Sequence, residues 1–284
     1  MNIRASMTSG YNDCRRRAVA RQWRRKFEKL GYEFRQTQPS VGSATGTACH
    51  TGIRLLFADK WNDRALNLDG AVEQAVNEFR AEIEKGCEWD ATTQNANVAE
   101  AQIRSQVNAF MHGPCQTEKP LTITDENGNP APAIELKLEA KISADWLLTG
   151  HIDVVTADHS IRDYKTGAVD RRYHEQLGAY SLLVRSNKIL TGPAKLYKDY
   201  VKRCGKTKTQ EAPVSTEYPV ALSERAAMGT IKGIIADMAK FDETQNLDEA
   251  FPANLMSMMC VERYCLAFNT DFCCLTKKRG GVKP

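Results

Sequence analysis

Residues 150–155 read Gly-His-Ile-Asp-Val-Val and residues 160–165 read Ser-Ile-Arg-Asp-Tyr-Lys, with Thr-Ala-Asp-His between them. Both segments predict β-strands, and the four polar residues between them suit a turn. A hairpin centred on Asp158 places Asp153 directly opposite Asp163, with Cβ atoms roughly 4.5–5.5 Å apart. Two carboxylates at that separation repel each other, so the sheet needs a compensating positive charge.

A divalent cation is the compensation that these residues favour, because hard cations take carboxylate oxygens as ligands. Lys165 lies two residues after Asp163 and therefore projects from the same face of the strand. Two acids and one lysine around one point suit metal-assisted attack on a phosphodiester. Taken singly, these residues have a simpler explanation. Asp163 and Lys165 could form an ordinary ion pair on a solvated strand face, and Asp153 could be a polar residue near a turn.

The order of these residues resembles the PD-(D/E)XK nuclease superfamily, and within it the RecB/AddB-like exonuclease branch. That branch includes CRISPR-associated RecB-like nucleases and phage exonucleases. The resemblance rests on Gly-x-Ile-Asp at 150–153, Asp-Tyr-Lys-Thr-Gly at 163–167 and Gln-x-x-x-Tyr at 176–180. It implies catalytic roles for Gln176 and Tyr180, which share one helix face and can reach the same DNA strand or the edge of an active site.

The resemblance also implies a metal site. Asp153 and Asp163 match the two acids that bind Mg²⁺ or Mn²⁺, and the carbonyl of Tyr164 is implied as a further ligand. Lys165 matches the lysine that orients or activates the attacking water. His50, in a stretch similar to the family's Gly-Thr-x-x-His helix start, is implied as a nitrogen ligand; without the other motifs it would pass as a core or surface histidine.

The chain has 9 cysteines, and four of them fall between residues 260 and 274. The first residues contain no apolar signal-peptide core, and no run of eighteen apolar residues predicts a membrane span. We therefore expect a reducing, cytoplasmic setting, in which clustered cysteines bind metal more often than they form disulfides. The spacing Cys260-x4-Cys265-x7-Cys273 lacks the paired Cys-x2-Cys knuckles of a zinc ribbon.

The resemblance implies an iron–sulfur cluster of the 4Fe-4S type, held by one N-terminal cysteine and three near the C-terminus. The matching residues are Cys14, Cys260, Cys265 and either Cys273 or Cys274, of which Cys273 is the better match. The family more often shows Cys-x2-Cys than the spacing found here, and a zinc site is the alternative. The remaining cysteines are expected to be small buried apolar residues: Cys49, Cys87, Cys115 and Cys204.

Composition and charge leave the choice of partner open. The net charge of +4 is too small to indicate binding of nucleic acid by itself. Eight basic residues between positions 15 and 29 could track a phosphate backbone or form a solvated helix face, and the sequence favours neither. Lys195, Lys198 and Lys202 follow one predicted strand and are candidates for DNA contacts.

The predicted fold is a single α/β domain over residues 1–284, with a restriction-endonuclease-like core and a mixed central β-sheet. It has a helical insertion at about 53–115, a nuclease core at about 133–205 and a C-terminal iron–sulfur region at about 251–276. The expected helices cover residues 10–30, most of 50–112, 171–187 and 221–241. The expected strands cover residues 133–142, 145–156, 160–165 and 194–203.

The resemblance, together with these patterns, implies a metal-dependent exonuclease that acts on the ends of single- or double-stranded DNA. A helicase or recombination partner, a homo-oligomer and a phage or mobile-element origin all fit the resemblance. Two alternatives outside the enzyme class are a DNA-end-binding iron–sulfur module without nuclease activity and a zinc-binding interaction protein. An endonuclease of the same fold is the alternative within the class.

Overall fold

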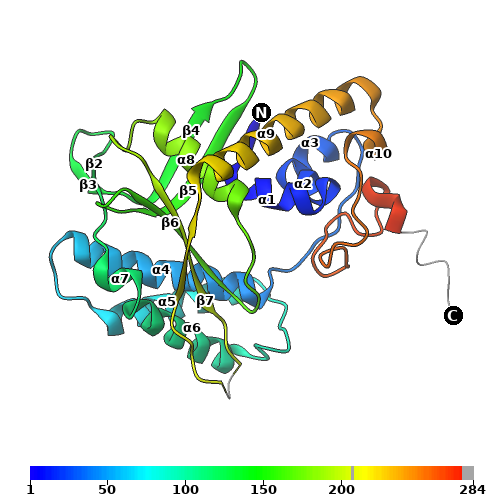
Figure 1. Ribbon diagram of the computed structural model, residues 1–284. Coiled ribbons are helices and arrows are strands. Elements are labelled where there is room, and N and C mark those ends of the chain that lie inside the picture. Colours follow the sequence, from blue (N-terminus) through cyan, green and yellow to red (C-terminus); the bar gives the residue numbers. More distant parts are fainter. Residues whose placement is uncertain (206–207, 277–284) are drawn as a thin grey trace.

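The computed structural model describes the backbone of residues 1–205 and 208–276, and side chains up to Cys273. Within these residues a mixed sheet of six strands lies between two layers of helices (Figure 1). The strands of the sheet are β1 (Asn2–Arg4), β4 (Ile134–Lys141), β5 (Leu147–Val155), β6 (Ser160–Gly167), β7 (Lys195–Lys202) and β8 (Val214–Tyr218). A separate hairpin consists of β2 (Thr122–Thr124) and β3 (Pro130–Pro132).

Helices cover both faces of the sheet. They are α1 (Ala5–Asp13), α2 (Arg15–Gln22), α3 (Arg24–Glu28), α4 (Val41–Trp61), α5 (Leu68–Ile83), α6 (Ala96–Met111), α7 (Pro114–Thr117), α8 (His174–Ser186), α9 (Val220–Thr244), α10 (Leu247–Ala250) and the 3₁₀ helix η1 (Asp271–Thr276). One hydrophobic core joins α1, α2, α8 and α9 to the sheet, and a second joins α4, α5 and α6 to its other face. None of the helices in the described part of the chain has the length and apolarity needed to cross a membrane.

The mixed α/β architecture confirms the predicted fold class at this level. The four expected strands correspond to β4, β5, β6 and β7, with ends that differ by a few residues. The short strands β1 and β8 were not predicted. The helix expected over residues 10–30 is wrong as a continuous element, because the backbone is extended at Cys14 (φ −154°) and turns again at Trp23. The break at Cys14 leaves the Asp13 carbonyl able to accept a hydrogen bond from Asn254 Nδ2.

The hairpin of β5 and β6 has the predicted register. Val154 pairs with Arg162 and Val155 with Ile161, so Asp153 and Asp163 occupy the next opposed position. The pairing of β5 with β6 ends before that position. On the same edge of β5, the other end of the strand pairs with β1. The two strands therefore separate where the acids lie, which opens room for other groups between them.

Two glycines bring α8 close to its neighbours. A Cβ at Gly150 of β5 would lie 2.4 Å from Leu183 Cδ1, so α8 packs directly on the strand. A Cβ at Gly178 of α8 would lie 1.9 Å from the Ser223 carbonyl oxygen in α9. The approach at Gly178 needs a residue without a side chain, because the atoms it would meet are backbone, whereas the contact at Gly150 is with the end of a side chain. Together the two contacts pack the helix that follows β6 between the sheet and α9.

Substitution of Gly178 by Ala should therefore destabilise the fold. The new methyl group collides with backbone rather than with a movable side chain, and overpacking of this kind costs about 1–3 kcal/mol. Gly229→Ala is the matched control, since Gly229 lies within α9 with no atom near its Cβ position. That control should gain up to about 1 kcal/mol from helix propensity. Urea unfolding measures both, and equal midpoints would contradict the close crossing of α8 and α9.

Candidate active site

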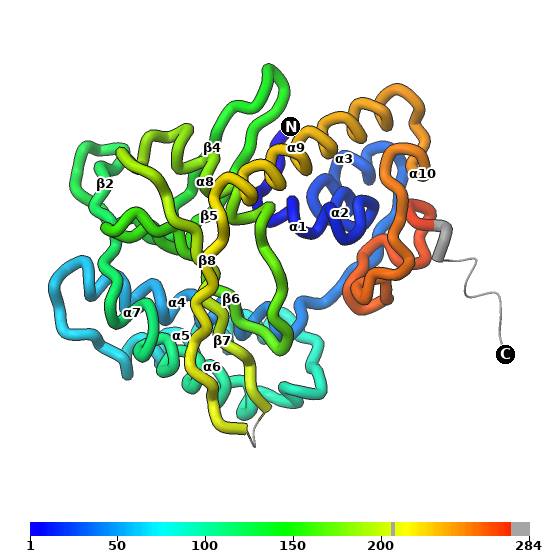
Figure 2. Tube along the Cα trace, in the orientation of Figure 1, coloured from blue at the N-terminus to red at the C-terminus, as the bar shows by residue number. Residues whose placement is uncertain are grey.

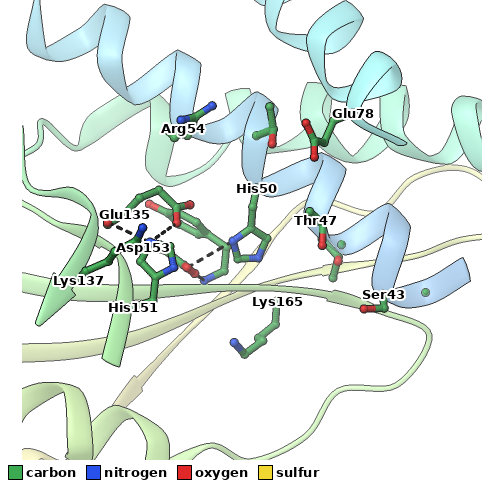
Figure 3. Close-up of a pocket in the computed structure, with 15 residues that line it drawn as sticks. Ser43, Thr47, His50, Arg54, Glu78, Glu135, Lys137, His151, Asp153 and Lys165 are labelled. Atoms are coloured by element: carbon green, nitrogen blue, oxygen red, sulfur yellow. Dashed lines mark hydrogen bonds and ion pairs between the residues drawn. The ribbon is translucent and has the colours of Figure 1, made fainter. Parts of the chain in front are cut away.

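Three secondary-structure elements meet at the open end of the β5–β6 hairpin. His50 projects from the middle of α4, and its Nδ1 lies 3.3 Å from Asp153 Oδ1 (Figure 3). The other oxygen, Asp153 Oδ2, accepts a hydrogen bond of 2.6 Å from the backbone N–H of Tyr164. The Tyr164 side chain also faces α4, where its ring stacks on Phe57. The structure thus brings His50 and Asp153 together, as the sequence resemblance implied.

Asp163 and Lys165 form the second half of the site. Lys165 Nζ lies 2.6 Å from Asp163 Oδ2, and Asp163 is 1% exposed. The Gln176 amide donates to Asp163 Oδ1 at 3.2 Å and to the Tyr180 hydroxyl at 2.8 Å. Gln176 and Tyr180 are both buried, so neither side chain is presented to solvent, where a DNA strand could be reached. Gln176 contacts Asp163 directly, and Tyr180 is connected to it only through Gln176.

Glu135 joins the site from β4 and was missed by the sequence analysis. Its carboxylate, the His50 imidazole and the Asp153 carboxylate each offer a ligand atom within 4.8 Å of the others. Among the described residues this is the only such group of three. His151 Nε2 lies 2.9 Å from both the carbonyl oxygen and Oε2 of Glu135, which fixes the side chain (Figure 3).

The backbone at Glu135 is strained. Its φ is 51°, in the left-handed region that non-glycine residues avoid, and the β4–β5 ladder skips it between Ile134 and Leu136. Strain of this kind costs about 1–3 kcal/mol and gathers at functional sites. A lone glutamate inside an expected strand gave no sequence signal, because the irregular position that turns it toward Asp153 is a tertiary feature.

The titratable groups divide into two pairs with different electrostatics. Burial raises the pKa of Asp153, but the imidazole of His50 outweighs it and holds the pKa below its usual value. Burial would lower the pKa of His50, yet Asp153 raises it to about 9. Burial raises the pKa of Asp163 to about 6 despite the opposing effect of Lys165. Two neighbouring acids whose pKa values move apart are typical of a site where one stays ionised and the other can exchange a proton.

Lys165 keeps its charge at neutral pH. Burial favours the neutral amine, but the carboxylates of Asp163 and Asp153 raise the pKa of Lys165 above its usual value. Its ammonium therefore supplies a positive charge next to two buried acids.

His50, Glu135, Asp153 and Lys165 line an open cavity of about 750 Å³ between α4 and the sheet. Gly46 and the small polar side chains of Ser43 and Thr47 form one wall on α4, and Arg54 and Lys137 add positive charge (Figure 3). A hard divalent cation takes oxygen ligands and tolerates an imidazole nitrogen, so the donor set of His50, Asp153 and Glu135 fits Mg²⁺ or Mn²⁺. The cavity is polar and wide enough to admit a phosphodiester beside such an ion.

The four cysteines expected to act together line one small cavity: Cys14, Cys260, Cys265 and Cys273. It lies where the N-terminal segment and the C-terminal segment run side by side, shown in blue and in orange to red in Figure 2. The side chain of Cys274, the alternative fourth ligand, lies outside the described residues. Among the other cysteines, Cys49, Cys115 and Cys204 are buried as expected, whereas Cys87 is half-buried.

The basic segment at residues 15–29 is largely tied into the fold. Arg16 is buried and donates to the carbonyls of Phe251 and Phe272 and to Asp248. Four further cations of the segment form ion pairs: Arg15–Asp237, Arg17–Asp13, Arg24–Glu28 and Lys26–Asp242. The structure therefore favours a stabilising role for most of this segment over contact with a phosphate backbone.

Comparison with known proteins supports this description. A model of the PD-(D/E)XK nuclease superfamily matches residues 5–267. No curated protein matches the sequence. The similar solved structures include a candidate exonuclease from Eubacterium rectale, at 10% identity and a TM-score of 0.40, with 57% of this chain and 60% of that chain covered. LHK-Exo in complex with dAMP is 10% identical, with a TM-score of 0.31, and the match covers 70% of this chain and 95% of that chain. SSO0001 is 12% identical, with a TM-score of 0.26, and the match covers 72% of this chain and 80% of that chain.

The strain at Glu135 leads to a paired prediction. Glu135→Ala and Glu135→Gly remove the same carboxylate and should weaken Mn²⁺ binding equally. They should differ in stability, because glycine adopts a positive φ without strain. We expect Glu135→Gly to be the more stable variant by about 1 kcal/mol, which reverses the usual order of the two residues in a strand. Urea unfolding without metal and titration with Mn²⁺ check both parts, and a more stable alanine variant would refute the strained backbone.

Proposed function

Because the chain belongs to the PD-(D/E)XK nuclease superfamily, we propose that it is a metal-dependent exonuclease that hydrolyses phosphodiester bonds of linear DNA. The observation that carries the proposal is the group of His50, Glu135 and Asp153 beside a buried aspartate–lysine pair. The choice of an exonuclease over an endonuclease rests on the resemblance of the motifs to the RecB-like branch.

The metal would be held by His50, Glu135 and Asp153, with Asp163 and the carbonyl of Tyr164 as further ligands. Once bound, Mg²⁺ or Mn²⁺ supplies Lewis-acid stabilisation of charge on the scissile phosphate and lowers the pKa of water. His50 would hold the ion as a neutral imidazole, whereas without metal Asp153 raises the pKa of His50 to about 9. The protein part of the mechanism lies with the residues around this group.

Lys165 carries the main electrostatic role of the protein. Its ammonium has three donors, and one of them reaches Asp163 Oδ2. The others can hold the attacking water and a phosphate oxygen on which negative charge develops. A fixed charge in a partly buried site stabilises such a transition state without reorganising when the reaction occurs.

Asp163 is kept in place by Gln176. The hydrogen bond from the Gln176 amide fixes Oδ1, which leaves Oδ2 directed toward Lys165. Burial raises the pKa of Asp163 to about 6 and Lys165 opposes that shift, so the ammonium helps to keep the carboxylate ionised. Arg54 and Lys137 on the cavity wall complement the negative charge of the DNA backbone.

We also propose that Cys14, Cys260, Cys265 and Cys273 hold an iron–sulfur cluster. The support is that all four line one cavity, with Arg16 and Arg17 beside them. Burial raises the pKa of Cys265 and raises that of Cys273 to about 11, and the two arginines oppose these shifts. The choice of a cluster over zinc rests on the resemblance of the motifs to the RecB-like branch. Such a cluster would join the N-terminal and C-terminal segments that line the cavity.

End-labelled linear DNA with Mg²⁺ or Mn²⁺ tests the nuclease proposal. Lys165→Met should lower the rate by about 100-fold or more, the size of effect expected when a fixed electrostatic donor is removed. Lys195→Met is the matched control, because Lys195 lies on the same sheet but is half exposed and pairs with Asp158. The control should retain wild-type activity, and chelation of the metal should abolish it.

A covalently closed circle separates the alternatives in the same assay. If the circle is cut, the protein is an endonuclease of this fold. If the folded wild type binds DNA ends and cleaves neither substrate with either metal, the proposed hydrolysis is wrong and the end-binding alternative gains support.

The visible spectrum of anaerobically purified protein tests the cluster. An iron–sulfur cluster gives a brown protein with broad absorbance and stoichiometric iron and sulfide, whereas zinc gives a colourless one. Cys260→Ser should lose the absorbance, while Cys49→Ser, in a buried position against Gln106, should keep it. A colourless wild type that contains one zinc ion would overturn the assignment.

A further inference from the structure

The loop between β6 and α8, residues 168–173, leads directly away from the aspartate–lysine pair. Parallel pairing places Lys198 of β7 beside Asp163, and Tyr200 beside Lys165. Residues paired in this way project from the same face of a sheet. Lys198 and Tyr200 therefore form a second row of side chains next to the proposed catalytic pair.

Both residues of this second row hold the loop. Lys198 is 3% exposed, and its Nζ lies 2.5 Å from Asp170 Oδ1 and 3.1 Å from the carbonyl oxygen of Arg171. The Tyr200 hydroxyl donates to the Gly167 carbonyl at 2.8 Å. A buried ammonium is costly to leave without partners, so the Lys198–Asp170 pair fixes the loop. This contradicts the expectation of a DNA contact for Lys198, and its strand neighbours Lys195 and Lys202 are also ion-paired.

The last residue of the loop, Tyr173, turns inward. Residues 168–172 are exposed, whereas Tyr173 is partly buried. Lys165 Nζ lies 5.1 Å from the centroid of the Tyr173 ring, within the range of a cation–π contact. The ammonium of Lys165 is thus held between the Asp163 carboxylate on one side and an aromatic face on the other.

We propose that Tyr173 and Lys198 are positioning residues for Lys165. Lys198 anchors the loop through Asp170, and the anchored loop places the Tyr173 ring against the ammonium that is to act on the phosphate. The inference rests on the proposed nuclease function for its kinetic consequence, but the placement of Lys165 is independent of it.

The ring contact is tested by single-turnover cleavage of linear DNA at saturating substrate and Mn²⁺. Tyr173→Leu should lower the rate of the chemical step about tenfold, which corresponds to about 1.4 kcal/mol, and leave KM unchanged. Tyr173→Phe keeps the aromatic face and should restore the rate. The matched control is Tyr197→Leu, which removes a ring 4.4 Å from the Arg162 guanidinium in the same sheet and should keep the wild-type rate.

The anchor is tested by Lys198→Met and Asp170→Asn, with Lys195→Met as the control. Each anchor variant should slow the chemical step. When an anchor variant is combined with Tyr173→Leu, the rate of the double variant should fall by less than the product of the two separate reductions, because both changes act through one loop. Asp170 is exposed, so Asp170→Asn keeps the test valid if Lys198→Met fails to fold. Additive effects, or a Tyr173→Leu variant with the wild-type rate, would overturn the proposal.

Chemical labelling separates this inference from the proposed function. In metal-free protein, trace acetic anhydride followed by mass spectrometry measures the reactivity of each lysine. Tyr173→Leu and Asp170→Asn should raise the labelling of Lys165 several-fold relative to Lys195, and Tyr173→Phe should not. Unchanged labelling refutes the positioning role, whereas changed labelling in a protein that cleaves no DNA supports the placement and refutes only the nuclease function.

Discussion

The burial of two aspartates at one point is the constraint on which the rest of the site depends. Asp153 and Asp163 face each other where β5 and β6 separate, and both are almost inaccessible to solvent. Buried carboxylates require charge compensation or hydrogen bonds. The fold supplies His50 and a backbone N–H to Asp153, and Lys165 and Gln176 to Asp163. The helix α4 on one face and the helix α8 on the other are thus tied to the same two acids.

The same arrangement makes the site asymmetric. Its histidine side is open to the cavity, where Glu135 adds a third ligand atom and a cation can enter. On its lysine side, the Tyr173 ring lies beside the ammonium of Lys165, which itself lines the same cavity. The three candidate ligand atoms therefore gather around Asp153, whereas the ammonium is paired with Asp163.

The hairpin could be predicted from the sequence because turn chemistry and strand register are local properties. One turn sets the register that places Asp153 opposite Asp163. The alternation of side chains along a strand then places Lys165 on the same face as Asp163. Glu135 could not be found in this way, since its place depends on an irregular position in β4. The fixed, buried role of Gln176 also depended on the packing of α8 against α9. The short strands β1 and β8 have too few residues to show a period.

The cysteine region has a consequence for how the molecule is made. Cys14 Sγ accepts a hydrogen bond from the backbone N–H of Asn254, 240 residues further along the chain. At 5–20 residues per second, a ribosome adds that length in about 12–48 s. Helix α4 and the β5–β6 hairpin are synthesised before Asn254, so the half that holds the candidate site can pack while the cavity around Cys14 still lacks its C-terminal side. The packing around Cys14 is therefore completed only after most of the described fold has been made.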